Sequence, residues 1–413
     1  MRILIISFFY HPEPNDIKIH SLARALTERG HHVRTITTFP NYPDGEIYPG
    51  YRQKWREWQN LDGVQVLRVP LYADHSRSGA KRILSYVSFM LSASLIGPWL
   101  SGPADVIWVY HPPLTTAVAG WWLSLTQLLR GRRTRFVLEI QDMWPETLAA
   151  TGMFSNPTGL KAVGAVAKFL YGRSAALTVN SPGMHANLIT KGVPAEKIQV
   201  MPNWADESIY MPTERDAATG QLHGLTDKFN VIFAGNIGTV QSLHTIIDAA
   251  AHLLDQPEIQ FVLIGDGVEL PALKAAVAAR DLPNVRFIDR HPASAMPGFF
   301  AWADALLISL KDDPLYRITI PAKTQSYLAS GRPIIAALAG DGADVIQQAD
   351  AGVTCAPGDA SALAKAVMSL YTMPRAERER LGSNGRAAYT AHYSQAQIVQ
   401  HYEGLFQRIA VRR

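Results

Sequence analysis

The chain has 413 residues, of which 47% are hydrophobic and 18% are charged, and Cys355 is its single cysteine. Such a length is too great for one hydrophobic core and indicates two or three domains, while the composition excludes a disordered or disulfide-rich protein. Residues 1–200 carry a formal charge of +8 (21 Lys and Arg against 13 Asp and Glu), whereas residues 201–413 carry −4 (18 against 22). This asymmetry predicts two domains that meet different partners.

The first half of the chain alternates apolar runs with helical patterns, which is typical of a parallel α/β sheet covered by helices. The opening run lacks a small-residue cleavage site and is interpreted as a buried strand. No glycine lies between Met1 and Gly30, which argues against a dehydrogenase-type G-x-G-x-x-G turn. We predict a helix over residues 19–29 and strands over residues 3–8, 33–38, 64–69, 106–110, 136–140, 176–180 and 198–201.

A polar loop follows the first predicted strand, at the end of the sheet where α/β proteins bind ligands. Its polar side chains are Glu13, Asp16 and Lys18. The loop is interpreted as a ligand-binding segment, with an ordinary strand-to-helix connection as the alternative.

Polar side chains also follow two later strands. His111 stands in Y-H-P-P-L, and Asp142 and Glu146 stand in V-L-E-I-Q-D-M-W-P-E. Both carboxylates are expected to face a ligand. Asp142 is also a suitable helix N-cap, with Glu146 in the first turn, and the two interpretations are compatible.

Residues 83–104 contain no ionised side chain, although Lys81 and Arg82 come directly before them. The segment is long enough to span a bilayer, but three serines fall on one helical face and a Gly-Pro pair at 97–98 interrupts the run. We predict a helix that lies in a membrane interface, with a buried core helix and a spanning helix as alternatives. The basic and aromatic residues 51–58 suit lipid headgroups or a solvated loop.

The second half of the chain repeats the alternation of strands and helices. In F-A-G-N-I-G, Gly235 and Gly238 flank Asn236 and allow backbone N–H groups to approach an anion. Arg290 follows a later strand. Strands are predicted over residues 230–234, 261–264, 285–287, 305–309 and 334–338, and helices over residues 243–254 and 270–279.

Residues 317–336 read R-I-T-I-P-A-K-T-Q-S-Y-L-A-S-G-R-P-I-I-A. Pro321 suits the first turn of a helix, and Lys323 adds a positive charge beside the helix N-terminus. Gly331 then ends the helix before another strand. The pattern predicts an anion site, with a diphosphate as the expected anion.

This segment resembles the donor-binding segment of the retaining GT-B glycosyltransferases of family four, in which P-[SA]-K opens a helix and A-x-G-x-P closes it. The linker V-M-P-N-W-A-D resembles that family's P-N-G-x-D, with Trp204 in place of glycine. D-M-W-P-E resembles a segment of bacterial enzymes that extend lipid-linked saccharides in O-antigen, capsule or colanic acid assembly, including L-fucosamine transferases.

The resemblance implies a GT-B fold, in which two Rossmann-like, doubly wound α/β domains face a cleft that holds the active site. Residues 1–203, with a helix near 395–413 packing back, are expected to bind the acceptor, and residues 204–394 the nucleotide sugar. The implied donor-binding residues are Gly235, Asn236, Gly238, Arg290, Lys323 and Ser326; the implied acceptor-binding residues are Glu13, Asp16 and Lys18; the implied catalytic residues are Lys323, Asp142, Glu146 and His111.

Two departures from the family pattern bear on the donor. Ser326 stands where many members carry a ribose-binding glutamate, and Asn236 and Gln241 stand near positions where members carry Arg and Lys. Lys323 is therefore expected to carry most of the charge neutralisation.

The resemblance implies retaining transfer from a nucleoside diphosphate sugar, expected to be UDP-linked, to a polyprenyl-diphosphate-linked saccharide. We expect a cytoplasmic enzyme held peripherally on an anionic membrane surface, at the inner face of the cytoplasmic membrane. No D-x-D motif is present, so no metal or other cofactor is implied, and no basic motif with interleaved aromatic residues supports a nucleic acid partner. The alternatives are a nucleotide-sugar 2-epimerase, a sugar phosphorylase, or a non-catalytic sugar-nucleotide sensor.

Overall fold

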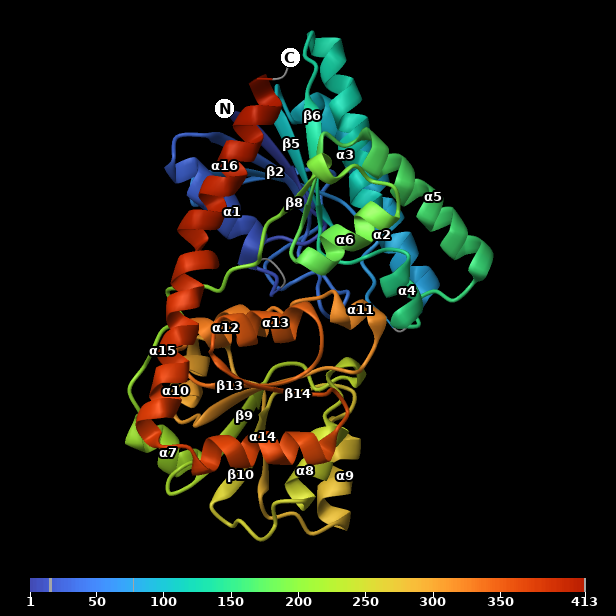
Figure 1. The fold of residues 1–413 in the computed structure, drawn as a ribbon. Helices are drawn as coiled ribbons and strands as arrows, with labels where there is room; N and C mark the ends of the chain where they lie inside the picture. Colours follow the sequence, from blue (N-terminus) through green and yellow to red (C-terminus); the bar gives the residue numbers. More distant parts are fainter. Residues whose placement is uncertain (15–16, 77, 412–413) are drawn as a thin grey trace. The chain divides into compact units, whose positions relative to one another are not determined.

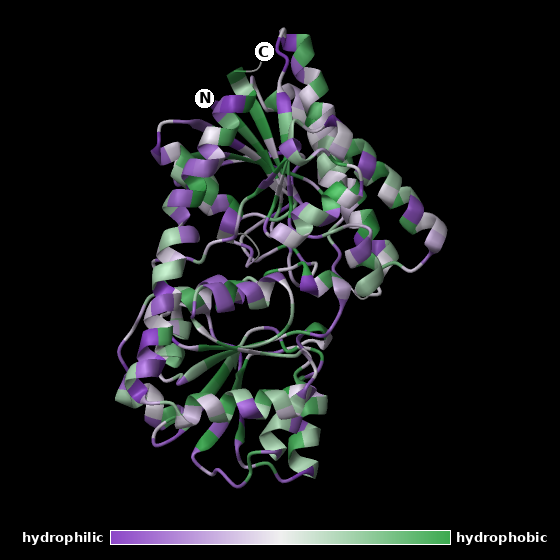
Figure 2. Ribbon diagram, in the orientation of Figure 1, coloured by the Kyte–Doolittle hydropathy of each residue, from purple (hydrophilic) through white to green (hydrophobic). Residues whose placement is uncertain are grey.

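The computed structural model describes residues 1–14, 17–76 and 78–411 (Figure 1). The chain divides into two compact units. The first comprises Met1–Pro202 together with the C-terminal helix from Ala396, and the second comprises Asn203–Gln395. In both units the strands are the most hydrophobic elements, as Figure 2 shows, because each sheet is buried between two layers of helices.

The first unit has an eight-stranded sheet of order β3-β4-β2-β1-β5-β6-β7-β8, parallel except for β3. The strand order reverses between β1 and β5, where Ile3 pairs with Val33 on one side and with Val106 on the other. Its strands are β1 Arg2–Ile6, β2 His32–Thr38, β3 Glu57–Leu61, β4 Val64–Val69, β5 Val106–His111, β6 Arg135–Ile140, β7 Ala176–Val179 and β8 Ile198–Val200. Its helices are α1 Ile17–Glu28, α2 Gly79–Leu100, α3 Leu114–Thr126, η1 Gln127–Arg130, α4 Glu146–Ala150, α5 Pro157–Arg173, α6 Pro182–Thr190, η2 Ala195–Lys197 and α16 Gln395–Val411.

Right-handed crossovers distribute these helices over the two faces of the sheet. Because the chain moves outward from β1 in opposite directions, α1 covers one face, and α2, α3 and α5 cover the other. The C-terminal helix α16 lies on the face of α1, where Glu403 pairs with Arg29 and His31.

The second unit has a six-stranded, fully parallel sheet of order β11-β10-β9-β12-β13-β14, which reverses between β9 and β12. Two apolar clusters, one on each face, form its core. Its strands are β9 Phe229–Ala234, β10 Ile259–Ile264, β11 Val285–Ile288, β12 Ala305–Ser309, β13 Ile334–Ala337 and β14 Gly352–Cys355. Its helices are α7 Ala217–His223, η3 Thr239–Gln241, α8 His244–Ala251, α9 Leu270–Ala279, η4 Ala293–Ala295, α10 Met296–Ala301, α11 Pro314–Arg317, α12 Lys323–Ala329, α13 Asp341–Gln348, α14 Ala360–Thr372 and α15 Arg375–His392.

The helix predicted from the uncharged segment runs further than expected. The prediction that Gly97-Pro98 interrupts it is wrong, because α2 continues to Leu100. Proline cannot donate to the carbonyl four residues earlier, that of Ser94. The indole N–H of Trp122 donates to that carbonyl at 3.1 Å instead, so the helix passes the proline with this oxygen satisfied.

A buried carboxylate ties the first unit together. Glu139 on β6 is fully buried and accepts hydrogen bonds from the Lys18 ammonium at 2.6 Å, from the Tyr402 hydroxyl at 2.6 Å and from the Thr178 hydroxyl. Lys18 also donates to the backbone oxygen of Met201 at 3.4 Å. One carboxylate therefore joins α1, the sheet, the end of the first unit's main segment and the returning helix α16.

We predict that Lys18→Met destabilises the first unit by about 3–5 kcal/mol, because it leaves Glu139 buried without a counter-charge. Tyr402→Phe removes a neutral donor and should cost about 1–3 kcal/mol. The urea midpoint of tryptophan fluorescence measures both effects. Arg24→Gln on the exposed side of α1 is the control and should stay within about 0.5 kcal/mol. An unchanged midpoint in Lys18→Met would contradict the prediction.

Candidate active site

The polar residues expected to bind the donor lie at the carboxyl edge of the second sheet. This edge is where ligands bind in open α/β sheets, at the point where the strand order reverses. Gly235 directly follows β9, and Ser309 ends β12, the two strands at the reversal. The loops after these strands are joined by a hydrogen bond from the Lys311 N–H to the Val240 oxygen at 2.9 Å.

Lys323 begins α12 and brings its ammonium group to this edge. The Nζ atom is buried, lies 3.6 Å from the centre of the Phe233 ring, and has no hydrogen-bond partner among the described residues. Burial without a counter-charge lowers the pKa of Lys323 to about 7. The site therefore holds a cation that an anion would stabilise.

The two-glycine turn makes room for that cation. A Cβ atom on Gly235 would lie 3.2 Å from Lys323 Nζ, and a Cβ atom on Gly238 would lie 2.6 Å from the side-chain Nδ2 atom of Asn236. The helix predicted over residues 243–254 is α8, which starts at His244, so the 3-10 turn η3 and Ser242 separate it from the two-glycine turn. The N–H groups of Gly235 and Ile237 already donate to the Ile264 and Asp266 oxygens at 2.9 and 2.8 Å, so the turn leaves those of Asn236 and Gly238 for a ligand.

Further buried polar atoms at this edge lack partners within the described part of the chain. They were not predicted, since single hydroxyl and amide side chains carry no pattern in a sequence. Buried polar atoms are normally paired, so a cluster of unpaired ones indicates a ligand site. The atoms are Gln241 Oε1, Ser309 Oγ, Thr324 Oγ1 and Gln325 Oε1.

The other two residues predicted to bind the donor, Ser326 and Arg290, lie in different surroundings. Ser326 shares a hydrogen bond with the hydroxyl of Tyr210, whose ring stacks on Phe300 with centroids 6.1 Å apart. A ribose contact by Ser326 would have to compete with that bond. Arg290 is exposed just past the end of β11, so its guanidinium is accessible to a ligand at the carboxyl edge.

In the first unit, His111 and Asp142 lie at the carboxyl ends of neighbouring strands β5 and β6. His111 is 1% exposed, packs edge-on to Trp144 at 5.4 Å, and has no hydrogen-bond partner for either ring nitrogen among the described residues. Burial lowers the pKa of His111 to about 3, so the ring is neutral. It can donate one hydrogen bond and accept another.

Asp142 is not the helix N-cap that the sequence suggested. The helix α4 begins at Glu146, with Pro145 at the N-cap position. The Asp142 carboxylate, half-buried, is therefore left without a capping bond, and desolvation raises its pKa to about 6. A carboxylate with that pKa is mostly ionised at neutral pH and basic enough to accept a proton.

Glu146 is partly engaged by a neighbouring helix. Its Oε1 atom pairs with the ammonium of Lys191 at 2.6 Å, while its buried Oε2 atom has no partner within the described residues. One oxygen therefore remains available to a substrate hydroxyl.

The first loop does not present its predicted ligand-binding groups. Glu13 is buried and accepts hydrogen bonds from the backbone N–H groups of Tyr10, Asn41 and Tyr42 at 2.7–3.0 Å. Lys18 is buried against Glu139, as described above. These internal contacts argue against a direct acceptor contact by either residue, because their charged groups already hold the unit together. Asp16 lies outside the described residues.

Comparison with known families agrees with this arrangement. Residues 17–204 match the family described as glycosyl transferase 4-like domain, and residues 228–373 match glycosyl transferases group 1. WcaI of Escherichia coli K12, whose name describes a colanic acid biosynthesis glycosyl transferase, is 30% identical over 80% of this chain and 82% of its own. The chain belongs to the GT-B glycosyltransferases of family-four type and is a transferase.

Solved structures show the same fold at low sequence identity. Sucrose-phosphate synthase from Thermosynechococcus elongatus matches with a TM-score of 0.73 and 17% identity, covering 99% of this chain and 98% of that one. The HepE protein of Anabaena, solved with UDP, matches with a TM-score of 0.71 and 16% identity, covering 99% of this chain and 100% of that one. Both likenesses confirm the two Rossmann-like domains of a GT-B fold.

We predict that affinity for UDP falls as the pH rises above about 7, by up to about tenfold per pH unit. The expectation that the diphosphate binds the charged form of Lys323, whose pKa in the free site is about 7, means that binding above that pH takes up a proton. Titration calorimetry between pH 6.5 and 9 measures the slope. In Lys323→Met the pH dependence of the affinity should vanish. Arg290→Gln should lower the affinity at every pH and leave its pH dependence unchanged. Equal slopes in wild type and Lys323→Met would contradict the assignment.

Proposed function

We propose that this glycosyltransferase moves a sugar, with retention of configuration, from a nucleoside diphosphate sugar to a polyprenyl-diphosphate-linked saccharide during bacterial surface polysaccharide assembly. The expected donor is UDP-linked, with an N-acetylated amino sugar or a deoxy sugar. The observation that carries the proposal is the buried, unpartnered ammonium of Lys323 beside the Gly235 turn. The name of WcaI supports the polysaccharide pathway, and the UDP bound by the Anabaena protein supports the donor class. The resemblance to L-fucosamine transferases is part of the same proposal.

In this proposal Lys323 neutralises the charge that develops on the departing diphosphate. Electrostatic stabilisation of this kind is among the largest contributions to catalysis, and a dry site strengthens it. Of the described residues, no group of three or more His, Cys, Asp and Glu side chains could hold a metal ion. We propose that charge compensation comes from Lys323 and from the N–H groups of Asn236 and Gly238 without a metal, since those of Gly235 and Ile237 are bonded within the sheet edge.

The first unit would then supply the groups that meet the acceptor. In the proposal Asp142 accepts or orients the acceptor hydroxyl proton, and the unpaired oxygen of Glu146 and the neutral ring of His111 supply further hydrogen bonds. In a front-face reaction the departing phosphate can share the role of base with Asp142.

Transfer can be tested directly with purified enzyme, a panel of nucleotide sugars and a polyprenyl-diphosphate-linked saccharide. The product should gain the mass of one sugar, and Lys323→Ala should lower turnover at least about 10²-fold. Rearrangement of the donor without an acceptor would indicate an epimerase. Release of a sugar phosphate would indicate a phosphorylase, and binding without turnover would indicate a sensor.

We predict that transfer activity falls as the pH drops below about 6, because protonated Asp142 cannot accept a proton. Asp142→Asn should lower turnover by about 10²- to 10⁴-fold, flatten this acidic limb, and leave nucleotide affinity within about threefold. A pH–rate profile with matched calorimetry checks both parts. Should the limb persist in Asp142→Asn, the departing phosphate is the base and Asp142 only orients the acceptor.

The protein is proposed to reach its lipid-linked acceptor by docking peripherally on the inner face of the cytoplasmic membrane, which implies a cytoplasmic enzyme. The helix α2 is long and apolar enough to cross a bilayer, and about a third of its most apolar window is buried in the first unit. Its orientation is unusual, since Ser85 is fully buried, whereas Leu95 is 70% exposed and Trp99 is 82% exposed.

The exposed apolar side chains of α2 continue onto neighbouring helices. The helices α2 and α3 are joined through Trp122 and Ser94, and α3 and α5 through the rings of Trp121 and Phe169, 5.0 Å apart. Together they form what we call the apolar surface, made of Leu84, Leu91, Leu95, Trp99, Trp122, Leu125, Leu128, Leu129, Val166 and Phe169. Ten exposed large apolar side chains on these helices and the turn η1 indicate an interaction site.

Charge favours an anionic membrane as the occupant of the apolar surface. The helices α2, α3 and α5 and the turn η1 contain six basic residues and no Asp or Glu. Cations beside apolar side chains attract anionic headgroups, at about 1 kcal/mol each. The packing of one face of α2 against the unit's own core supports interfacial docking rather than spanning.

We predict that Leu95→Gln weakens binding to anionic vesicles about tenfold, since an inserted leucine contributes about 1.5–3 kcal/mol. High salt should weaken binding further by screening the cations. Co-sedimentation measures both effects, and Leu222→Gln, which changes a similarly exposed leucine of the second unit, is the matched control. Protein that needs detergent to leave the vesicles, or that ignores them at low salt, would refute interfacial docking.

A further inference from the structure

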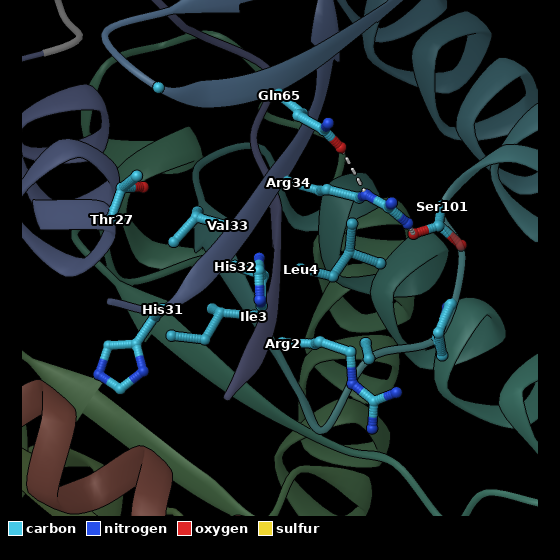
Figure 3. A pocket seen from close by; sticks show the side chains of 13 residues that line it. Arg2, Ile3, Leu4, Thr27, His31, His32, Val33, Arg34, Gln65 and Ser101 are labelled. Carbon is cyan, nitrogen blue, oxygen red and sulfur yellow. Dashed lines mark hydrogen bonds between the residues drawn. The ribbon is translucent and has the colours of Figure 1, made fainter. Parts of the chain in front are cut away.

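A pocket of about 250 Å³ lies at the amino edge of the first sheet (Figure 3). Its walls come from the starts of β1 and β2, from Gln65 on β4 and from Ser101 just past the end of α2. The residues expected to meet substrates in this unit lie at the opposite, carboxyl edge. The pocket is therefore separate from the candidate active site.

The lining of the pocket is positively charged. Two arginines, Arg2 and Arg34, are among its lining residues (Figure 3), and none of the described residues that line it is Asp or Glu, although Glu403 binds the lining residue His31 from outside. Asp105 binds Arg2 from outside the lining, through two oxygens, and so offsets part of its charge. Arg34 has no such counter-charge, since its partners are neutral oxygens. An anion is the ligand that this lining favours.

The guanidinium of Arg34 is held in a fixed orientation. Its Nε atom donates to Gln65 Oε1 at 2.9 Å, and Nη1 donates to the Ser101 oxygen at 3.0 Å. A Cβ atom on Gly102 would lie 1.9 Å from Nη1, so the glycine allows this close approach. The Nη2 group has no hydrogen-bond partner among the described residues and remains as a pre-positioned donor.

The size of the pocket limits what it can hold. Drug-sized ligands fill about 300–1,000 Å³, so this pocket is too small for a nucleotide sugar or an oligosaccharide. A phosphate group with a few attached atoms fits the volume and matches the planar donors of arginine.

We propose that this pocket binds the phosphate group of a small phosphate ester, and that the ester is the headgroup of an anionic membrane lipid. Arg34 and Gln65 also line a neighbouring pocket with Trp58 and Leu100. Leu100 directly follows Trp99, the most exposed residue of α2 in the apolar surface. A lipid whose chains meet the apolar surface therefore has a phosphate site within reach.

The proposal of a phosphate site is based on the geometry of the pocket and does not depend on the proposed function. Its lipid source rests on the membrane docking proposed above. Because the tests below contain neither sugar donor nor acceptor, their failure would not touch the transfer assay, and failure of transfer would not touch them.

Three variants test the site in the full-length protein. Arg34→Gln removes both the charge and the planar guanidinium donors. Arg34→Lys keeps the charge but loses those planar donors. Arg24→Gln removes an exposed charge on α1 outside the pocket. The soluble probes are inorganic phosphate and glycerol 3-phosphate, measured by thermal stabilisation. The membrane probes are phosphatidylcholine vesicles with and without phosphatidic acid, measured by co-sedimentation.

Arg34→Gln should weaken binding to phosphatidic acid vesicles about fivefold more than Arg24→Gln does. Arg34→Lys should keep much of the vesicle binding, because the charge remains. It should lose most of the stabilisation by glycerol 3-phosphate, because the fixed guanidinium donors are absent.

The two arms separate the sources of the phosphate. A specific loss on vesicles supports a lipid headgroup, and a loss confined to the soluble probes replaces the lipid by a free phosphate ester. If Arg34→Gln behaves like Arg24→Gln in both arms, the pocket is not a phosphate site.

Discussion

The first unit is organised around a carboxylate that has been removed from water. Glu139 is reached by Lys18 from 121 residues upstream and by Tyr402 from 263 residues downstream, and both contacts are 2.6 Å long. A buried charge without partners costs several kcal/mol, so the sheet is stable only when α1 and the C-terminal helix are both in place. The backbone oxygen of Met201 joins the same group through Lys18. Both places where the chain leaves and re-enters this unit are thus fastened near one point.

The second unit also buries a charged side chain, but this charge has no compensating partner among the described residues. Lys323 is also a buried charge, but no carboxylate of the described chain compensates it, and its pKa falls to about 7. In the first unit His111 keeps two unpaired ring nitrogens, and desolvation brings the pKa of Asp142 to about 6. Where Glu139 is satisfied and structural, these groups are left unsatisfied. Unpaired groups of this kind are the ones that a bound ligand could satisfy, and they are the reason for proposing substrate roles for Lys323, His111 and Asp142.

The helix α2 shows how one constraint shapes a surface. Its Ser85 is fully buried in the first unit, and its exposed side includes Leu95 and Trp99. The helix passes Pro98 because Trp122 satisfies the carbonyl that the proline leaves free, and this contact also fixes α3 beside it. The same tryptophan is itself part of the apolar surface. Local backbone repair and the formation of a docking surface are therefore one arrangement of side chains.

The sequence by itself determined the alternation of strands and helices and the glycine end of α12 at Gly331, and it singled out Lys323 as a candidate, because periodicity, left-handed glycine positions and a charged motif are local properties. It missed β3, whose residues 57–61 alternate weakly, and it gave ligand roles to Glu13 and Lys18, which the fold buries. Only the tertiary structure decided which charges are paired and which faces are covered. Lys18 and Lys323 are equally conspicuous in a sequence. A carboxylate 121 residues away neutralises the first and none reaches the second, and such distances exist only once the chain has folded.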